Sequence, residues 1–194
     1  MDGKIFLVRH GEVSAEYRGR YIGSTDAPLD IDAAQNALLN LRRNLNGICR
    51  SCFCSPLKRA AATAENVFPD MKIVYDPRLR EIDFGEWENL TFEEIRQSAG
   101  CEIIQRWCDA PDEMVFPGGE SYPQFALRVD DFFNWILLNG YVAGNPCVVT
   151  HGGVIMRAME KFLQIPHAES IKWLPPRGEM RILTLANGEL TDVQ

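Results

Sequence analysis

A cationic and a nucleophilic side chain stand together near the start of the chain, where Arg9 and His10 follow the apolar run Ile5–Val8. Such a run indicates a buried strand, and ligands of open α/β sheets bind just outside the carboxyl ends of the strands. A neutral imidazole there can attack phosphorus, and an adjacent guanidinium can hold phosphate oxygens in a fork. Phosphoryl transfer is therefore a reaction that Arg9 and His10 could perform together.

Three more segments carry polar or charged residues just after an expected strand or at the start of an expected helix. Arg59 lies in the first turn of a helix, where its charge opposes the helix dipole, and a bound anion explains this better than a solvated side chain. His151 follows an apolar run and precedes two glycines, which favour close approach of the backbone to a ligand. The third segment, 79–85, offers Glu81 and Asp83, with further acids at 86 and 88, and the residues alone leave open which is functional.

The elements that would position these groups alternate between strands and helices. The apolar patterns predict strands over Ile5–Val8, Ser51–Cys54, Ile73–Tyr75, Cys147–Thr150, Arg181–Leu185 and Leu190–Val193. They predict helices over Asp32–Leu45, Leu57–Val67, Phe92–Ala99, Ser121–Leu138 and Val154–Leu163. This order predicts an α/β fold in which helices cover both faces of a mainly parallel sheet, a three-layer α/β/α arrangement.

Length and composition suit one domain over residues 1–194, because the chain is long enough for a sizeable core and 46% of its residues are hydrophobic. The segment from residue 77 to residue 117 is the least regular. It is interpreted as a lid-like insertion, with a helical cap of no special function as the alternative. Trp87 and Trp107 within it are expected in the core, and His167, after Pro166, is expected on the surface without a role.

The formal net charge of −7 argues against nucleic acid or an anionic membrane as the main partner, since both favour basic surfaces. A small phosphorylated metabolite remains possible, because a local arginine cluster can bind phosphate on an acidic protein. The sequence has no apolar run of membrane-spanning length and no signal-peptide pattern, so a cytoplasmic protein is expected. The oligomeric state cannot be predicted.

The six cysteines include a CxxC pair, Cys49 and Cys52, but the pair leads into an expected strand rather than a helix start. Cys101 and Cys108 are seven residues apart and Cys147 is alone, so no second close pair completes a zinc site. Buried free thiols are the better interpretation, and no metal or other cofactor is expected.

Four motifs together resemble the histidine phosphatase superfamily, which includes the cofactor-dependent phosphoglycerate mutases. They are Arg9-His10-Gly11-Glu12, Ser55-Pro56-Leu57 with Arg59-Ala60, Leu79-x-Glu81 with Phe84-Gly85, and His151-Gly152-Gly153 with Arg157. They follow one another in the family's order from residue 5 to about residue 157. The chain departs from the family at Glu16, where asparagine is frequent, and at Ala33, where glycine is frequent.

The resemblance implies a phosphoglycerate mutase-like fold and a metal-independent phosphomonoesterase that acts through a phosphohistidine. His10 is then the nucleophile, and Arg9, Arg59 and His151 bind the phosphoryl oxygens. The resemblance also selects Glu81 as the general acid and base.

Within the family, the motifs look most like those of the α-ribazole phosphatases. A phosphoglycerate mutase, which shares the chemistry, and a non-catalytic module that binds a phosphorylated ligand remain alternatives.

Overall fold

A single six-stranded sheet forms the centre of the computed structural model, which describes residues 2–99, 105, 107 and 109–194. The strands are β1 (Gly3–Arg9), β2 (Cys52–Cys54), β3 (Ile73–Tyr75), β4 (Cys147–Thr150), β5 (Met180–Ala186) and β6 (Glu189–Val193). Their order in the sheet is β3-β2-β4-β1-β5-β6. The first four are parallel, whereas β5 is antiparallel to β1 and β6 to β5. The predicted α/β class with a mainly parallel sheet is confirmed.

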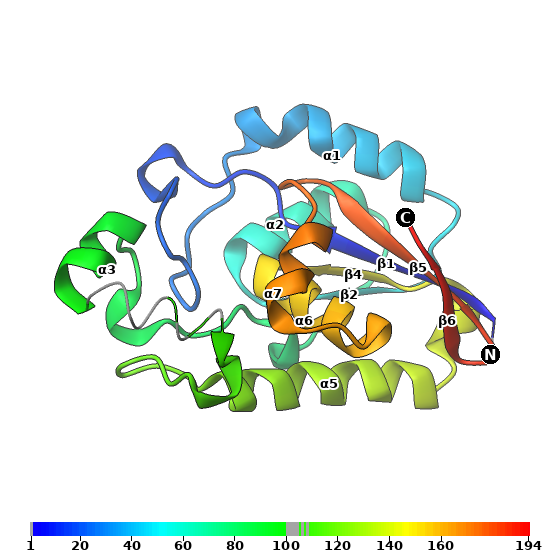
Figure 1. The fold of residues 1–194 in the computed structure, drawn as a ribbon. Coiled ribbons are helices and arrows are strands. Elements are labelled where there is room, and N and C mark those ends of the chain that lie inside the picture. The colour runs from blue at the N-terminus through cyan, green and yellow to red at the C-terminus, as the bar shows by residue number, and fades with distance from the viewer. Residues whose placement is uncertain (1, 100–104, 106, 108) are drawn as a thin grey trace.

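Helices cover both faces of this sheet (Figure 1). Helices α1 (Ile31–Leu45) and α2 (Lys58–Val67) pack on one face, and α5 (Tyr122–Leu138) and α6 (Gly152–Leu163) on the other. Helix α3 (Phe92–Ala99) lies at one end of the molecule, and the short α7 (His167–Ser170) follows α6. The arrangement has the three layers that the sequence predicts.

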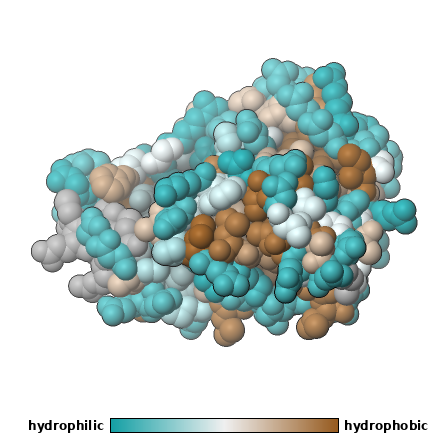
Figure 2. Space-filling model, turned by 45° about the vertical axis from the view of Figure 1, so that its right-hand side comes forward, coloured by the Kyte–Doolittle hydropathy of each residue, from teal (hydrophilic) through white to brown (hydrophobic). Residues whose placement is uncertain are grey.

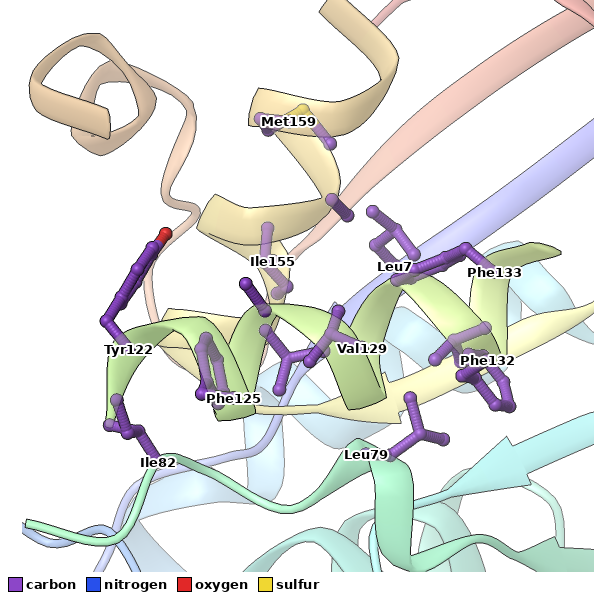
Figure 3. Close-up of a cluster of buried hydrophobic side chains, with 14 of the residues drawn as sticks. Leu7, Leu79, Ile82, Tyr122, Phe125, Val129, Phe132, Phe133, Ile155 and Met159 are labelled. Carbon is purple, nitrogen blue, oxygen red and sulfur yellow. The ribbon is translucent and has the colours of Figure 1, made fainter. Parts of the chain in front are cut away.

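Strand β1 shows why both faces must be covered. Ile5 and Leu7 contribute to a hydrophobic cluster with α5 and α6, whereas Phe6 and Val8 contribute to a second cluster with α1 and α2. Because side chains alternate along a strand, a strand that is apolar at every position has to be buried on both sides. Figure 3 shows the first cluster, with Leu7 beside Phe133 of α5.

The helices begin where the sequence provides capping groups. The Asp30 side chain accepts a hydrogen bond from Ala33 N at the start of α1. Ser121 and Gln124 form a reciprocal capping box at the start of α5. Such caps satisfy N–H groups that have no partner within the helix, and they fix the residue at which each helix begins.

The predicted strands and helices agree with the structure to within one or two residues at their ends. The sequence did not predict α7, nor the helical conformation of residues 105, 107 and 109. Cys49, Cys52, Cys54 and Cys147 are buried free thiols, as predicted. Cys101 and Cys108 lie outside the described residues. Trp87 belongs to the core, as expected, and Trp107 is partly buried against it.

Segment 77–117 contains α3 and three short 3-10 turns, at Pro77–Leu79, Gly85–Trp87 and Pro111–Glu113. Its interpretation as a lid-like insertion stays a prediction. Figure 2 shows that hydrophobic residues gather across the middle of one face of the molecule, within a largely hydrophilic surface. Within the described parts of the chain, no helix is both long enough and apolar enough to cross a membrane.

Candidate active site

The pairing of β1 with β4 brings two histidines together. The two strands are parallel, and Arg9 lies opposite Thr150 in their register. His10, which directly follows β1, donates its backbone N–H to the Thr150 carbonyl at 2.9 Å. His151 follows Thr150 directly, and the ring centroids of His10 and His151 are 5.2 Å apart. Residues 141 positions apart in sequence therefore form one site at the carboxyl edge of the sheet.

The His10 imidazole is held as a neutral base. Its Nδ1 lies 2.7 Å from the Gly11 carbonyl oxygen, so Nδ1 carries the proton and donates it, and Nε2 keeps its lone pair. Burial lowers the pKa of His10 well below its ordinary 6.5, and the nearby guanidiniums of Arg59 and Arg9 lower it further. A neutral imidazole with a free Nε2 is the form that can attack phosphorus.

His151 is also buried and neutral, but its hydrogen bonds leave a donor free. Its Nε2 lies 2.7 Å from Ser55 Oγ, which also accepts the Leu57 N–H at 3.3 Å. Among the described residues, Nε2 is the acceptor within reach of the Ser55 hydroxyl proton, so we assign this proton to the bond with Nε2, which places the His151 proton on Nδ1. That buried Nδ1 contacts no hydrogen-bond partner among the described residues. Burial, and then the charge of Arg59, lower the pKa of His151 well below 6.5.

Both predicted phosphate-binding arginines are fixed by backbone carbonyls. Arg9 Nη1 donates to the Pro175 carbonyl at 2.9 Å. The fully buried Arg59 donates through Nη1 to the Thr25 carbonyl at 2.7 Å and through Nη2 to two further carbonyls. In each guanidinium the buried Nε has no partner among the described residues. Each arginine thus keeps a donor that an oxyanion could use, although most of the Arg59 fork is already engaged.

A clamp on residues 22–25 positions Arg59. The guanidinium binds the carbonyls of Ile22, Gly23 and Thr25, whereas the Glu88 carboxylate accepts the N–H groups of Gly23, Ser24 and Thr25. Burial lowers the pKa of Arg59 to about 10, and the nearby carboxylate of Glu88 limits this decrease. Arg59 therefore remains charged at neutral pH.

Glu81 follows the 3-10 turn Pro77–Leu79, and its side chain contacts the start of α6. Its Oε2 accepts the Gly153 N–H at 3.0 Å, and its Oε1 accepts the N–H of Ile82, also at 3.0 Å. A Cβ on Gly153 would lie only 2.4 Å from Glu81 Oε1. Glycine is therefore needed at position 153 if the carboxylate is to stay where it is.

The other acids of this segment are engaged elsewhere. Asp83 accepts hydrogen bonds from Ser24 Oγ and Gly85 N, and Glu88 binds the backbone N–H groups of residues 23–25. Glu86 is exposed. Of the four acids that the sequence left open, Glu81 is the one that lines the same cavity of about 190 Å³ as His10.

Arg128 of α5 holds the segment that carries Glu81, and the sequence analysis missed it. Its guanidinium donates to the carbonyls of Arg78, Arg80 and Glu81 at 2.6–3.0 Å and pairs with Glu120 at 2.8 Å. A positive charge on a helix 47 residues away gives no local sequence signal for this role.

Arg177 is a second functional candidate that sequence reasoning missed. It lines the His10 cavity and pairs with Glu12 at 3.0 Å. The next residue, Gly178, donates its N–H to the carbonyls of Arg9 and His10. Because β5 is antiparallel to β1, the start of β5 lies at the edge where β1 ends. This strand direction brings Arg177 to the site, and no local sequence pattern signals it.

Two further residues named from the sequence have other surroundings than the motifs suggest. Arg157, part of the second-histidine motif, pairs with Asp130 and Glu160 rather than pointing into the site. The expectation that His167 lies on the surface is wrong. Its side chain is 11% exposed, because it bonds to Glu160 at 2.7 Å.

The described residues contain no group of three or more His, Cys, Asp or Glu side chains arranged to hold a metal ion. The positive charge of the site comes instead from Arg9 and Arg59, with Arg177 beside them. Guanidiniums can neutralise developing charge on a transferred phosphoryl group, as metal ions do in other enzymes.

The profile of the histidine phosphatase superfamily (branch 1) matches residues 5–193. An adenosylcobalamin/alpha-ribazole phosphatase of Escherichia coli is 30% identical over 166 residues, which cover 84% of this chain and 80% of that protein. Phosphoserine phosphatase 1 of Hydrogenobacter thermophilus is 30% identical over 158 residues, or 80% of this chain and 74% of the relative. The solved alpha-ribazole phosphatase of Shigella flexneri has a TM-score of 0.83 at 26% identity, covering 97% of this chain and 93% of that chain.

The neutral, buried state of the two histidines predicts a pH-dependent stability. Below pH 6.5 the unfolded chain binds protons on His10 and His151 that the folded protein does not, so the free energy of unfolding falls as the pH falls. Between pH 7.5 and pH 5.5 each histidine should cost about 1.4 kcal/mol. Urea unfolding at the two pH values measures this loss.

The variant His10→Gln provides the control, because it lacks one of the two groups. Its loss between the same pH values should be smaller than that of the wild type by about 1.4 kcal/mol. An equal loss in both proteins would contradict a neutral, buried His10.

Proposed function

The chain belongs to the histidine phosphatase superfamily, and we propose that this phosphatase hydrolyses phosphomonoesters through a phosphohistidine on His10, without a metal ion. The observation that carries the proposal is a set of three buried nitrogen atoms, Arg9 Nε, Arg59 Nε and His151 Nδ1. Each is a donor without a partner among the described residues. The two arginines lie close enough to His10 to lower its pKa, and the His151 ring packs beside the His10 ring. Buried donors are costly to leave unpaired, so a bound oxyanion is the group that they fit.

In the first step of the proposed reaction, His10 Nε2 attacks phosphorus and a nitrogen–phosphorus bond forms. The phosphorus–oxygen bond to the leaving group breaks. Glu81, which takes up the proton that the phosphomonoester monoanion brings into the site, donates it to the departing oxygen, which leaves as an alcohol. Arg9, Arg59 and His151 hold the three equatorial oxygens, whose charge must be stabilised through a loose transition state.

In the second step, water attacks the phosphohistidine. The Glu81 carboxylate takes one proton from that water, the nitrogen–phosphorus bond breaks, and inorganic phosphate leaves. That proton leaves with the phosphate, which departs as its monoanion, so Glu81 ends as a carboxylate and His10 ends neutral, the states in which both groups began. The acid of the first step thus becomes the base of the second, as is usual when one group serves both halves of a reaction.

The substrate in this proposal is a small phosphorylated metabolite, and α-ribazole phosphate is the first to test. The names of the Escherichia coli and Shigella flexneri relatives support this choice. Those names and the phosphoserine phosphatase also favour hydrolysis over a mutase reaction, although an assay with a bisphosphate primer separates the two directly. Any turnover excludes a module that only binds phosphate.

The proposal also treats residues 1–194 as a single cytoplasmic domain with residues 77–117 as its lid-like insertion. Phe84 and Trp107 of this segment support the lid, because they line a cavity beside the proposed reaction centre. Neither nucleic acid nor a membrane is a partner in this proposal.

The nucleophile is tested by His10→Ala, for which turnover should fall by about a thousandfold or more because the covalent intermediate cannot form. Radiolabelled phenyl phosphate, quenched during turnover, should leave an acid-labile and base-stable label on the wild type and none on the variant. The matched control His167→Ala, which alters a histidine outside the reaction centre, should still take the label. A variant with near wild-type turnover would refute the role of His10.

The acid is tested by Glu81→Gln with two leaving groups. Hydrolysis of ethyl phosphate should slow by about a hundredfold, because its alkoxide needs a proton to depart. With 4-nitrophenyl phosphate the burst of nitrophenolate should persist while the steady state slows, since only the water step then lacks its base. Glu86→Gln alters an exposed neighbouring acid and is the control. Equal losses for both substrates, without a burst, would move the role to another acid.

The placement of Glu81 is tested separately by Gly153→Ala. The added Cβ would displace the carboxylate from a site only 2.4 Å away, so the variant should show the same dependence on the leaving group as Glu81→Gln. The unfolding free energy should change by only about 1 kcal/mol, because the helix propensity of alanine offsets the weakened Gly153 N–H bond to Glu81 and the 3.3 Å contact with Phe125. Gly144→Ala, whose Cβ would lie 3.4 Å from Arg50, is the control. Unchanged kinetics would contradict the placement.

Independence from metal is tested with a chelator. Turnover of 4-nitrophenyl phosphate should be unchanged after dialysis against EDTA, because arginines supply the charge at the phosphoryl group. Loss of activity that a divalent ion restores would count decisively against this part of the proposal.

A further inference from the structure

A second, larger cavity adjoins the one that contains His10. Its volume is about 580 Å³, within the range of sites that hold small organic ligands. Arg9, Glu81 and Gly152 line both cavities, so the larger one opens directly onto the proposed reaction centre. A phosphomonoester whose phosphorus faces His10 would therefore have its organic part in or beside this space.

The walls of the larger cavity are mainly apolar and aromatic. Tyr21, Phe84, Trp107 and Phe125 line it, and Tyr21 and Phe84 each pack against Trp107 with ring centroids about 6 Å apart. Apart from Arg9 and Glu81, no described lining residue carries a carboxylate, an ammonium or a guanidinium group. A charged organic group that lies away from Arg9 and Glu81 would lose its water here without gaining a counter-charge, which is unfavourable.

Hydrogen bonds hold two of the rings that line the cavity in place. Tyr122 donates its hydroxyl to Glu160 at 2.7 Å, and His167 Nδ1 bonds to the same carboxylate at 2.7 Å. Arg157 completes the pairing of Glu160 at 2.9 Å. Burial would raise the pKa of Glu160, but hydrogen bonds from these three residues lower it overall, so the carboxylate stays charged and holds both rings in place. The wall therefore presents rings in fixed orientations, with His167 at 28° to Trp107 and at 69° to Tyr122.

We propose that this cavity binds the leaving group and selects phosphomonoesters of flat, uncharged aromatic alcohols over those of small charged alcohols such as serine or sugar acids. The inference rests on the proposed function, since it concerns the alcohol that the phosphatase releases. Aromatic rings bury a large apolar area and pack against aromatic walls in offset or edge-on geometries, both of which this cavity offers. Serine phosphate would bring an ammonium and a carboxylate into the same walls.

The test compares kcat/KM for three primary-alkyl substrates, so that the chemistry of the departing oxygen is matched. These are 2-(1-naphthyl)ethyl phosphate, glycerol 1-phosphate and O-phosphoserine. The naphthyl substrate should be preferred at least tenfold over each of the others. Equal rates for all three would overturn the inference while leaving the phosphatase intact, whereas hydrolysis of none would overturn the proposed function as well.

A cavity-filling variant locates the preference. Ala168 of α7 lines the cavity and is exposed, so Ala168→Trp can reduce the space without burying a new side chain in the core. The ratio of kcat/KM for the naphthyl substrate to that for glycerol 1-phosphate should fall at least tenfold, and this ratio does not depend on the fraction of folded enzyme. Ala33→Trp, at an exposed position on α1, should leave the ratio unchanged. An unchanged ratio in Ala168→Trp would show that the aromatic group binds elsewhere and would overturn the inference.

Discussion

The parallel pairing of β1 with β4 is the constraint on which the rest of the site depends. It sets Arg9 opposite Thr150, and the residues that follow them are His10 and His151. Side chains alternate across a strand, so a slip of one residue would turn one histidine to the opposite face of the sheet. Strand β2 continues the same edge, because Ser55 N donates to the Val149 carbonyl at 3.0 Å and thereby brings the Ser55 hydroxyl to His151. The apolar strands that form the core thus also set the geometry of the polar groups.

Gathering like charges at this edge has a cost that the surroundings only partly offset. Two imidazoles and the Arg59 guanidinium are buried together beside the half-buried Arg9, and the imidazoles stay neutral because burial and the guanidiniums lower their pKa values. Arg59 stays charged because carbonyls bind it and the carboxylates of Glu81 and Glu88 lie nearby. The Nε atoms of Arg9 and Arg59 remain unpaired, and an unpaired buried donor costs about 1–3 kcal/mol. Such a cost is expected where a site is built for a ligand rather than for stability.

The sequence predicted what local patterns can encode. Apolar runs and 3.6-residue periodicity placed nearly every strand and long helix, and the positions after the strands pointed to His10, Arg59 and His151. It could not show that the β5 strand runs antiparallel to β1, and this direction is what carries Arg177 to the site. Nor could it show that backbone carbonyls accept most of the hydrogen bonds of the Arg59 guanidinium, or that His167 is largely buried by its hydrogen bond to Glu160. Each of these depends on contacts between distant segments, for which no local pattern exists.

The position of Glu81 relates the two cavities to a single reaction. Its carboxylate lines both the smaller cavity with His10 and the larger apolar cavity. In a phosphomonoester the bridging oxygen joins the phosphoryl group to the organic part, so this oxygen must lie where the two spaces meet. A proton donor serves the proposed chemistry only at that boundary, because the bridging oxygen is the atom on which negative charge develops. Arg128 and Gly153 keep the carboxylate there, the first by holding the backbone of Glu81 and the second by leaving room beside it. Arg128 and Gly153 take no part in the proposed reaction, but they determine the position of the Glu81 carboxylate.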